Sequence, residues 1–262
     1  MKHVLAGVVA LGLIAAIAIA FFKGPETTIT LSGARAELSA QDRDTLHVFV
    51  TLQNGALPDT LIGASSDIAR AVKLVSRQPT SGLPIPANST PVLSQDGAYF
   101  ALVGVEGALE EGQLVPISFE FATSGSLVTR ANISAPNDPN AAHREMMASS
   151  TMNMKLLDED QEVPTAELNV VQSPDGTWAV TLDVAHFTFD PDAEEPIHVP
   201  GHGHAHLYLN GIKLQRMFGP NASIGALPAG DFVVQVSLNT NDHRPYRNDA
   251  GPVEAVANIV VE

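Results

Sequence analysis

The stretch HAHLYLNGIKLQRMF, residues 204–218, contains the clearest structural signal in the chain. Two strand-like runs flank the pair Asn210-Gly211, and both of these residues tolerate the positive φ angles that a two-residue hairpin turn requires. The first run alternates polar and apolar side chains, which is typical of a half-buried strand. The stretch therefore predicts an antiparallel β-hairpin and places this part of the chain in the all-β class.

The same alternation determines which side chains share a face of the first strand. Successive side chains of a strand point to opposite faces, and alternate residues lie ~6.5–7 Å apart. His204 and His206 are therefore expected on one face, while Ala205 and Leu207 point the other way, toward a core.

Outward from this hairpin, short runs rich in Val, Ile, Thr and Phe alternate with Gly, Pro, Asn and Asp. This pattern is typical of an antiparallel sandwich. It predicts one β-sandwich domain over residues 27–133 and a second over residues 151–262. The segment 134–150 begins with a stretch rich in Pro and Asn and is expected to be a linker. The fold class is therefore all-β, with two β-sandwich domains.

The N-terminus carries an unbroken apolar run over residues 4–22, flanked by Lys2 and Lys23. Such a run is typical of an export signal, and Ala18 and Ala20 form an A-x-A pattern that favours cleavage. The run is also nearly long enough to span a bilayer. Residues 1–26 are expected to be a signal peptide or membrane anchor. The rest of the chain is then periplasmic or extracytoplasmic, anchored to the inner membrane by residues 4–22 if no cleavage occurs.

The composition excludes some partners and some metal ligands. The net charge is −15 and the sequence pI is about 4.8, so a nucleic-acid partner is not expected, because phosphate binding needs a basic face. The chain has no cysteine, which excludes disulfides and thiolate ligands. Any metal site must use histidine, methionine or carboxylate side chains.

Four of the nine histidines fall between residues 198 and 206. Two histidines at positions i and i+2 of a strand can hold one metal ion, which makes His204 and His206 the predicted ligand pair. His202, in a glycine-flanked segment, is a further candidate, and His243, after a later strand, is the best remote one. Met152 and Met154 are soft-ligand candidates, although core packing explains their spacing equally well. His198 is expected to lie in a loop, and the histidine cluster can also be incidental.

The C-terminal part resembles a β domain of unassigned activity that recurs in exported proteins. The resemblance rests on GHGHAHLYLNG and on SLNTNDH, with Phe218 standing where that domain has tyrosine. It implies an Ig-like or cupredoxin-like sandwich in which His204, His206, Asp242 and His243 are the marked residues. Asp242 is expected to hydrogen-bond a ligand imidazole and so to fix its tautomer.

The N-terminal part carries LQNGALPDTLIGASSDIARAVKL, residues 52–74, and a second segment from Pro84 to Phe121. Over residues 28–133 it resembles the periplasmic copper chaperone family PCu(A)C, which implies a cupredoxin-like β-sandwich. That family binds Cu(I) with two histidines and two methionines. Here Val75, Tyr99 and Ala101 occupy three ligand positions, and no methionine lies between Gly82 and Ile85. This domain is therefore not expected to bind Cu(I), and it is left with a docking or spacer role.

Taken together, these features predict an extracytoplasmic copper-binding protein that is not an enzyme, with the metal held by the C-terminal domain. Imidazoles suit Cu(II), added thioethers suit Cu(I), and zinc is the alternative metal. The expected roles are delivery to a cuproenzyme or another copper carrier, or sequestration. Two other functions stay open: a copper/zinc metalloenzyme of the dismutase type, and a docking or adhesion module without metal.

Overall fold

The computed structural model describes residues 28–39, 41–107, 109–134, 155–157, 162–190 and 198–262. Every regular element in this described part is a strand, so the all-β prediction is confirmed. Its residues contain no helix with the length and apolar character to cross a membrane. The predicted signal or anchor at residues 4–22 and the predicted linker at 134–150 lie outside the described residues.

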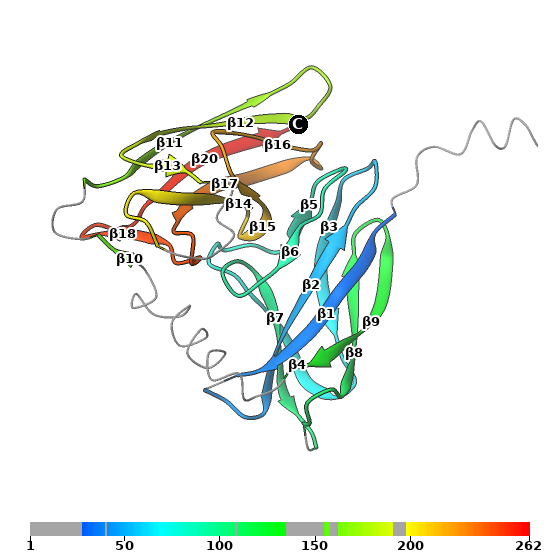
Figure 1. Ribbon diagram of the computed structural model, residues 1–262. Coiled ribbons are helices and arrows are strands. Elements are labelled where there is room, and N and C mark those ends of the chain that lie inside the picture. The colour runs from blue at the N-terminus through cyan, green and yellow to red at the C-terminus, as the bar shows by residue number, and fades with distance from the viewer. Residues whose placement is uncertain (1–27, 40, 108, 135–154, 158–161, 191–197) are drawn as a thin grey trace, which may run out of the picture.

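The N-terminal half consists of nine strands that curl around an apolar interior (Figure 1). They form one path of hydrogen-bonded neighbours, β6-β2-β1-β9-β8-β3-β5, with β7 paired to β2 and β4 paired to β7. The strands are β1 (Thr30–Leu38), β2 (Thr45–Gln53), β3 (Asp59–Ser65), β4 (Ala69–Val75), β5 (Leu83–Ile85), β6 (Val92–Leu93), β7 (Tyr99–Val105), β8 (Leu114–Phe121) and β9 (Gly125–Ile133).

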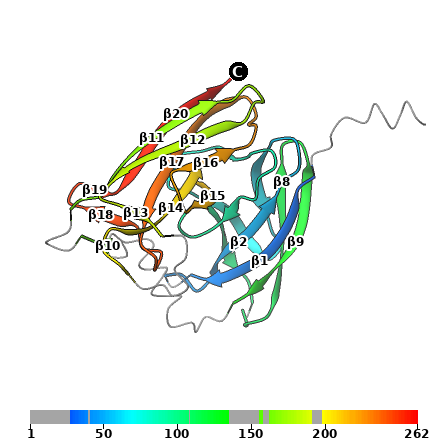
Figure 2. The same ribbon diagram turned by 45° about the horizontal axis from the view of Figure 1, so that its top comes forward.

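The C-terminal half consists of a main sheet, β20-β17-β14-β15, and two three-stranded sheets, β11-β12-β16 and β10-β18-β19 (Figure 2). Strand β13 adds to β14 in parallel. The strands are β10 (Lys155–Leu156), β11 (Thr165–Gln172), β12 (Trp178–Ala185), β13 (Thr188–Phe189), β14 (His202–Leu209), β15 (Ile212–Met217), β16 (Asn221–Ile224), β17 (Gly230–Asn239), β18 (Tyr246–Asn248), β19 (Gly251–Pro252) and β20 (Glu254–Val261).

The predicted hairpin is confirmed as β14 and β15. Asn210 and Gly211 have φ angles of 48° and 86°, as a tight turn between antiparallel strands requires. The side-chain oxygen of Asn210 also accepts a 2.7 Å hydrogen bond from the backbone N–H of Val233. The turn is therefore attached to β17, the strand on the other side of β14.

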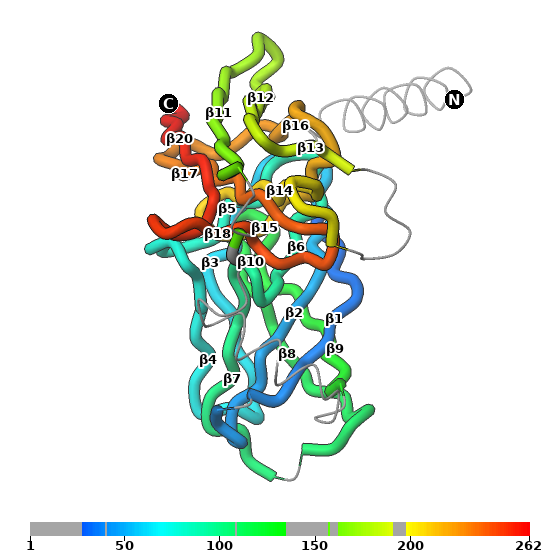
Figure 3. The backbone as a smooth tube through the Cα atoms, turned by 60° about the vertical axis from the view of Figure 1, so that its left-hand side comes forward, coloured from blue at the N-terminus to red at the C-terminus, as the bar shows by residue number. Residues whose placement is uncertain are grey.

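The two halves touch along a continuous sheet. Strand β6 pairs with β2 of its own half and, through Val92 opposite Lys213, with β15 of the other half. Figure 3 shows β6 lying between the strands of the two halves. The buried apolar side chains of both halves also form a single cluster. The division into two domains stays a prediction, and below the two parts are called the N-terminal half (β1–β9) and the C-terminal half (β10–β20).

A backbone contact brings the halves close at a second point. The N–H of Ala87 donates a 2.9 Å hydrogen bond to the carbonyl oxygen of Ala226. A Cβ atom on the neighbouring Gly225 would lie 1.8 Å from the carbonyl oxygen of Ala87. Only glycine allows these two backbone segments to approach so closely.

Within the N-terminal half, Asp59 at the start of β3 holds the turn between β8 and β9. Its buried carboxylate accepts hydrogen bonds from the backbone N–H groups of Thr60, Thr123 and Ser124, at 2.7, 2.9 and 2.9 Å, and from the Ser124 hydroxyl at 2.7 Å. Burial opposes the charge, but these hydrogen bonds outweigh it and lower the pKa of Asp59 below its usual value.

The substitution Asp59→Ala is expected to lower the free energy of unfolding by about 2–3 kcal/mol, because three backbone donors lose their charged acceptor. The folded-state pKa lies below the ordinary value of 3.8, so this stabilisation is present above that value and is lost as the pH falls through the folded-state pKa. Urea denaturation at neutral pH and again at about pH 3 measures both effects. The exposed Asp67→Ala is the control, and an equal loss in both variants would contradict the assignment.

Candidate metal centre

Strand β14 separates an apolar face from a polar one, and both faces are buried. Ala205, Leu207 and Leu209 belong to the apolar core. His204, His206 and Tyr208 point the other way and lie opposite Asn239, Ser237 and Gln235 of β17, all of which are buried too. Burying so many polar groups is costly unless each finds a partner.

Three imidazoles meet on this polar face. Nε2 of His204 lies 2.9 Å from Nε2 of His206 and 3.1 Å from Nδ1 of His243. One ligand atom from each of the three lies within 4.8 Å of the others. Nitrogen ligands bind transition metals at about 2.0–2.1 Å, so these atoms converge on a space that a single ion can occupy. Among the described residues no second group of three or more metal-ligating side chains occurs.

The site is buried on one side and open on the other. His204 and His206 are 3% and 2% exposed, whereas His243 lies on the surface. The ring of Phe218, which is exposed, lies 5.7 Å from the ring of His204. An ion would therefore enter from the side that His243 and Phe218 border.

Close packing of β14 against β17 sets the position of His204. A Cβ atom on the preceding Gly203 would lie 1.8 Å from the carbonyl oxygen of Asn239. A side chain at Gly203 would therefore push the two strands apart where His204 pairs with Asn239. The glycine next to the histidine is thus a requirement of strand spacing rather than a sign of a flexible loop.

A compact turn after β17 positions His243. The N–H of His243 donates to the carbonyl of Thr240, and the N–H of Thr240 donates to the carbonyl of Arg244, both at 2.9 Å. The Asn239 side chain donates a long 3.4 Å hydrogen bond to the carbonyl of His243. His243 adopts a φ of 66°, which is uncommon for a residue other than glycine, and these bonds stabilise it there.

Asp242 shapes this same turn. Its carboxylate accepts hydrogen bonds from the Thr240 hydroxyl and, at 2.8 Å, from Nε of Arg244. Burial opposes the charge of Asp242, but these bonds lower its pKa below the usual value. A hydrogen bond between Asp242 and a ligand imidazole was predicted, but both of these bonds come from other residues of the turn. The carboxylate that contacts a cluster imidazole is that of Asp96, at 3.1 Å from Nδ1 of His206.

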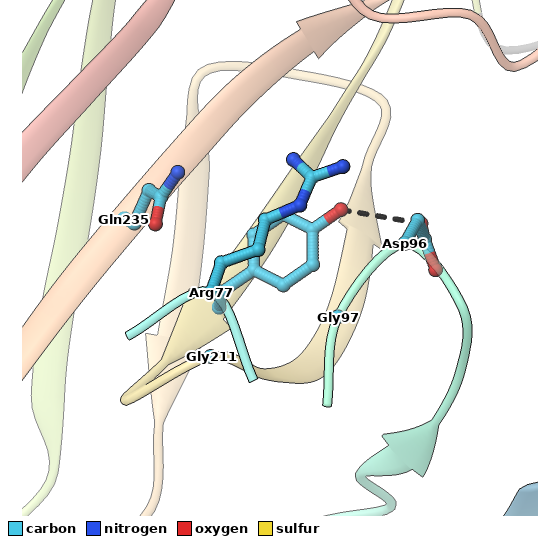
Figure 4. A pocket seen from close by; sticks show the side chains of 6 residues that line it. Arg77, Asp96, Gly97, Gly211 and Gln235 are labelled. Carbon is cyan, nitrogen blue, oxygen red and sulfur yellow. Dashed lines mark hydrogen bonds between the residues drawn. The ribbon is translucent and has the colours of Figure 1, made fainter. Parts of the chain in front are cut away.

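Sequence reasoning missed Asp96, because it lies in the other half of the molecule. The loop from Ser94 to Ala98, between β6 and β7, carries it to the polar face of β14 (Figure 4). Its Oδ2 atom also accepts hydrogen bonds from the Tyr208 hydroxyl at 3.2 Å and from Nζ of Lys213 at 2.5 Å. No local pattern around SQDGA indicates this role.

The imidazoles are neutral at physiological pH. Burial and the neighbouring His206 and His243 lower the pKa of His204 to about 3. Burial lowers the pKa of His206 to about 4, although its hydrogen bond to Asp96 acts in the opposite direction. Burial, followed by the positive charges of Arg216 and Lys213, lowers the pKa of His243 as well. Only neutral imidazole can coordinate a metal, so the three side chains have the charge state that coordination requires.

The other predicted site residues lie apart from this group or outside the described part. His202 begins β14, where it pairs with Thr188, and it is not one of the three clustered histidines. Met152 and Met154 lie outside the described residues. His198 lies before β14, with its ring 6.3 Å from that of Tyr246.

The positions that hold copper ligands in the PCu(A)C family come together in the N-terminal half, but without ligating groups at three of them. Val75 lies opposite Tyr99, and Ala101 lies opposite His47. The rings of His47 and Tyr99 pack 4.7 Å apart, and Tyr99 also contacts Phe49. An aromatic cluster therefore lies where those ligands are expected.

Comparison with known proteins bears on the N-terminal half. A family model described as "lipoprotein LpqE-like" matches residues 29–133. The N-terminal half resembles this LpqE-like family. The resemblance that the sequence indicated for residues 28–133 is thus confirmed in its position and extent. A search of curated proteins found no significant match.

Solved structures similar to this half have titles that name PCuAC domains. "Copper-bound PCuAC domain from PmoF2" is 20% identical, with 41% of this chain and 93% of that chain covered and a TM-score of 0.38. "Apo PCuAC domain from PmoF1" is 19% identical, with 41% and 94% covered and a TM-score of 0.39. "Solution structure of CuI-DR1885 from Deinococcus Radiodurans" is 25% identical, with 44% and 81% covered and a TM-score of 0.35.

The substitution Thr240→Val is expected to loosen the turn that carries His243. The buried hydroxyl donates to Asp242 and accepts a 3.1 Å hydrogen bond from the backbone N–H of Arg244, and valine offers neither. We expect the free energy of unfolding to fall by about 1–2 kcal/mol. Hydrogen exchange at the Arg244 amide should quicken more than exchange along β12. Thr240→Ser keeps the hydroxyl and is the matched control; equal effects of the two variants would show that the hydroxyl does not hold the turn.

Proposed function

We propose that this protein binds copper through His204, His206 and His243 and serves as an extracytoplasmic copper carrier or store. The observation that supports the proposal is the convergence of three neutral imidazoles, two buried and one exposed, within 4.8 Å. The extracytoplasmic location is supported by the apolar run at residues 4–22.

Copper is favoured over other divalent ions by the chemistry of the ligands. Imidazole sites bind first-row metals in an order that peaks at Cu(II), and the chain has no cysteine to offer a thiolate. The resemblance of residues 28–133 to a copper chaperone family supports the same metal. If Met152 and Met154 approach the site, their thioethers would let it hold Cu(I) also.

A carrier must release its metal, and the exposed ligand suits this task. His243 lies at the surface on a short turn, whereas His204 and His206 are fixed in a strand. A recipient protein could replace one ligand at a time, beginning with His243. We infer that the recipient is a cuproenzyme or another copper carrier; sequestration needs the same site without a recipient.

Copper binding is expected at a ratio of one ion per chain, and the double substitution His204→Ala with His206→Ala is expected to abolish it. His243→Ala, which removes a surface side chain, should weaken affinity by at least 10-fold without disturbing the core. Competition titration against a chelator of known affinity measures each constant, and circular dichroism checks that the variants are folded.

His186→Ala is the matched control for these titrations. This imidazole is exposed, lies outside the cluster and contacts Glu162 at 2.6 Å. Its removal should leave copper affinity unchanged. If the double variant binds copper as the wild type does, the assigned site is wrong. If zinc outcompetes copper at equal concentration, the proposed metal is wrong.

A second candidate function is a metalloenzyme, and the openness of the site supports it. Three protein ligands leave a coordination position for water or substrate, which is the arrangement of catalytic metal sites. Superoxide is the substrate to test, because paired histidines on a sandwich strand also occur in the copper/zinc dismutases. Turnover of superoxide by the copper-loaded chain, lost in His243→Ala, would favour the enzyme over the carrier.

A further inference from the structure

Asp96 belongs to the N-terminal half, but its carboxylate is bonded to side chains of the C-terminal half. Figure 4 shows Asp96 and Gly97 on one loop, which lines a small pocket together with Arg77 and with Gly211 and Gln235 of the other half. All three donors to its Oδ2 atom, from His206, Tyr208 and Lys213, are in β14 or β15. Asp96 therefore joins the two halves at the place where the imidazoles cluster.

The two nitrogens of His206 have different partners. Nδ1 lies 3.1 Å from Oδ2 of Asp96 and 3.2 Å from the Tyr208 hydroxyl, and Nε2 lies 2.9 Å from Nε2 of His204. Oδ2 of Asp96 also lies 2.5 Å from Nζ of Lys213, and this ion pair requires the carboxylate to be ionised. An ionised carboxylate can only accept a hydrogen bond, and the Tyr208 hydroxyl donates its one hydrogen to the same Oδ2 atom, so Nδ1 of His206 carries the hydrogen.

This bond determines which nitrogen of His206 can coordinate a metal. With the hydrogen on Nδ1, the lone pair is on Nε2, which is the atom that faces His204 and the open space of the cluster. A carboxylate that accepts from a ligating imidazole also raises the basicity of the ligand and fixes its ring orientation.

We infer that Asp96 of the N-terminal half is the positioning residue of the metal site, because its carboxylate holds His206 in the orientation and tautomer that present Nε2 to the ion. The inference rests on the proposed function, and it gives the N-terminal half a part in metal binding although that half lacks the ligands of its family. Neither half contains the complete site.

Asp242 is the other carboxylate close to the cluster, but its hydrogen bonds lie within its own turn. Both of its oxygens are engaged within its own turn, by Thr240 and by Arg244. Lys213 is a different kind of neighbour of Asp96: it adds a positive charge and a hydrogen bond without touching an imidazole nitrogen.

The first test is metal affinity in the full chain. Asp96→Ala is expected to weaken Cu(II) binding by about 10–100-fold while the stoichiometry stays at one ion. Asp67→Ala removes a surface carboxylate of the same half and is the matched control. Lys213→Gln leaves the bond between His206 and Asp96 in place, so its loss of affinity should be smaller. An equal loss in Lys213→Gln and Asp96→Ala would mean that Asp96 merely docks the halves, and would overturn the inference.

The second test needs no metal and separates this inference from the proposed function. Long-range ¹H–¹⁵N correlation spectra of the metal-free protein report which nitrogen of each histidine carries the hydrogen. In the wild type His206 should show the hydrogen on Nδ1, and in Asp96→Ala it should shift toward a mixture of tautomers. If the wild type binds no copper but shows this change, the proposed function fails and the positioning role stands. If the His206 tautomer is the same in both proteins, the positioning role is wrong even where copper binds.

Discussion

The hydrogen bonds that Asp96 accepts from the opposite half are the interaction that links the histidine cluster to the contact between the two halves. Strand β14 buries His206 and Tyr208 on a polar face, and Lys213 lies beside them. Groups of this kind are costly to bury without partners. One carboxylate oxygen provides a partner for all three. The other half thus supplies a partner for these polar groups, and His206 lies in both the histidine cluster and the contact between the halves.

The sequence predicted the features that depend on local periodicity. Alternation along HAHLYL brought His204 and His206 to one face, and Asn210-Gly211 predicted the turn that the structure contains. The contact between Asp96 and His206 could not be predicted, because the two residues lie more than one hundred positions apart and no motif surrounds Asp96. The contact with a cluster imidazole that was expected of the Asp242 carboxylate is made instead by the carboxylate of Asp96. The resemblance of SLNTNDH to an exported β domain suggested this role, whereas in the structure Asp242 accepts hydrogen bonds from Thr240 and Arg244.

The N-terminal half forms the predicted β-structure although Val75, Tyr99 and Ala101 stand at three positions where the family that it resembles has copper ligands. The sequence alone shows Val75, Tyr99 and Ala101 at the positions of the copper ligands. It does not show that the neighbouring surface contacts the C-terminal half. Ser76, directly after Val75, lies against Gly211 of the β14–β15 turn, since a Cβ atom there would fall 2.2 Å from the serine hydroxyl. The hairpin of the C-terminal half therefore docks beside the end where the family has its copper ligands.

The residues of the site lie far apart in the sequence, and this separation affects when their contacts form during folding. More than half of the sequence separates Asp96 from His243, and β14 lies between them. Contacts between residues so far apart form late, because the entropy of closing long loops must be overcome before the contacts stabilise anything. The unfolded chain therefore holds no pre-formed cluster of imidazoles. Under the proposed function, the strands would have to pair before the three imidazoles could bind one ion together.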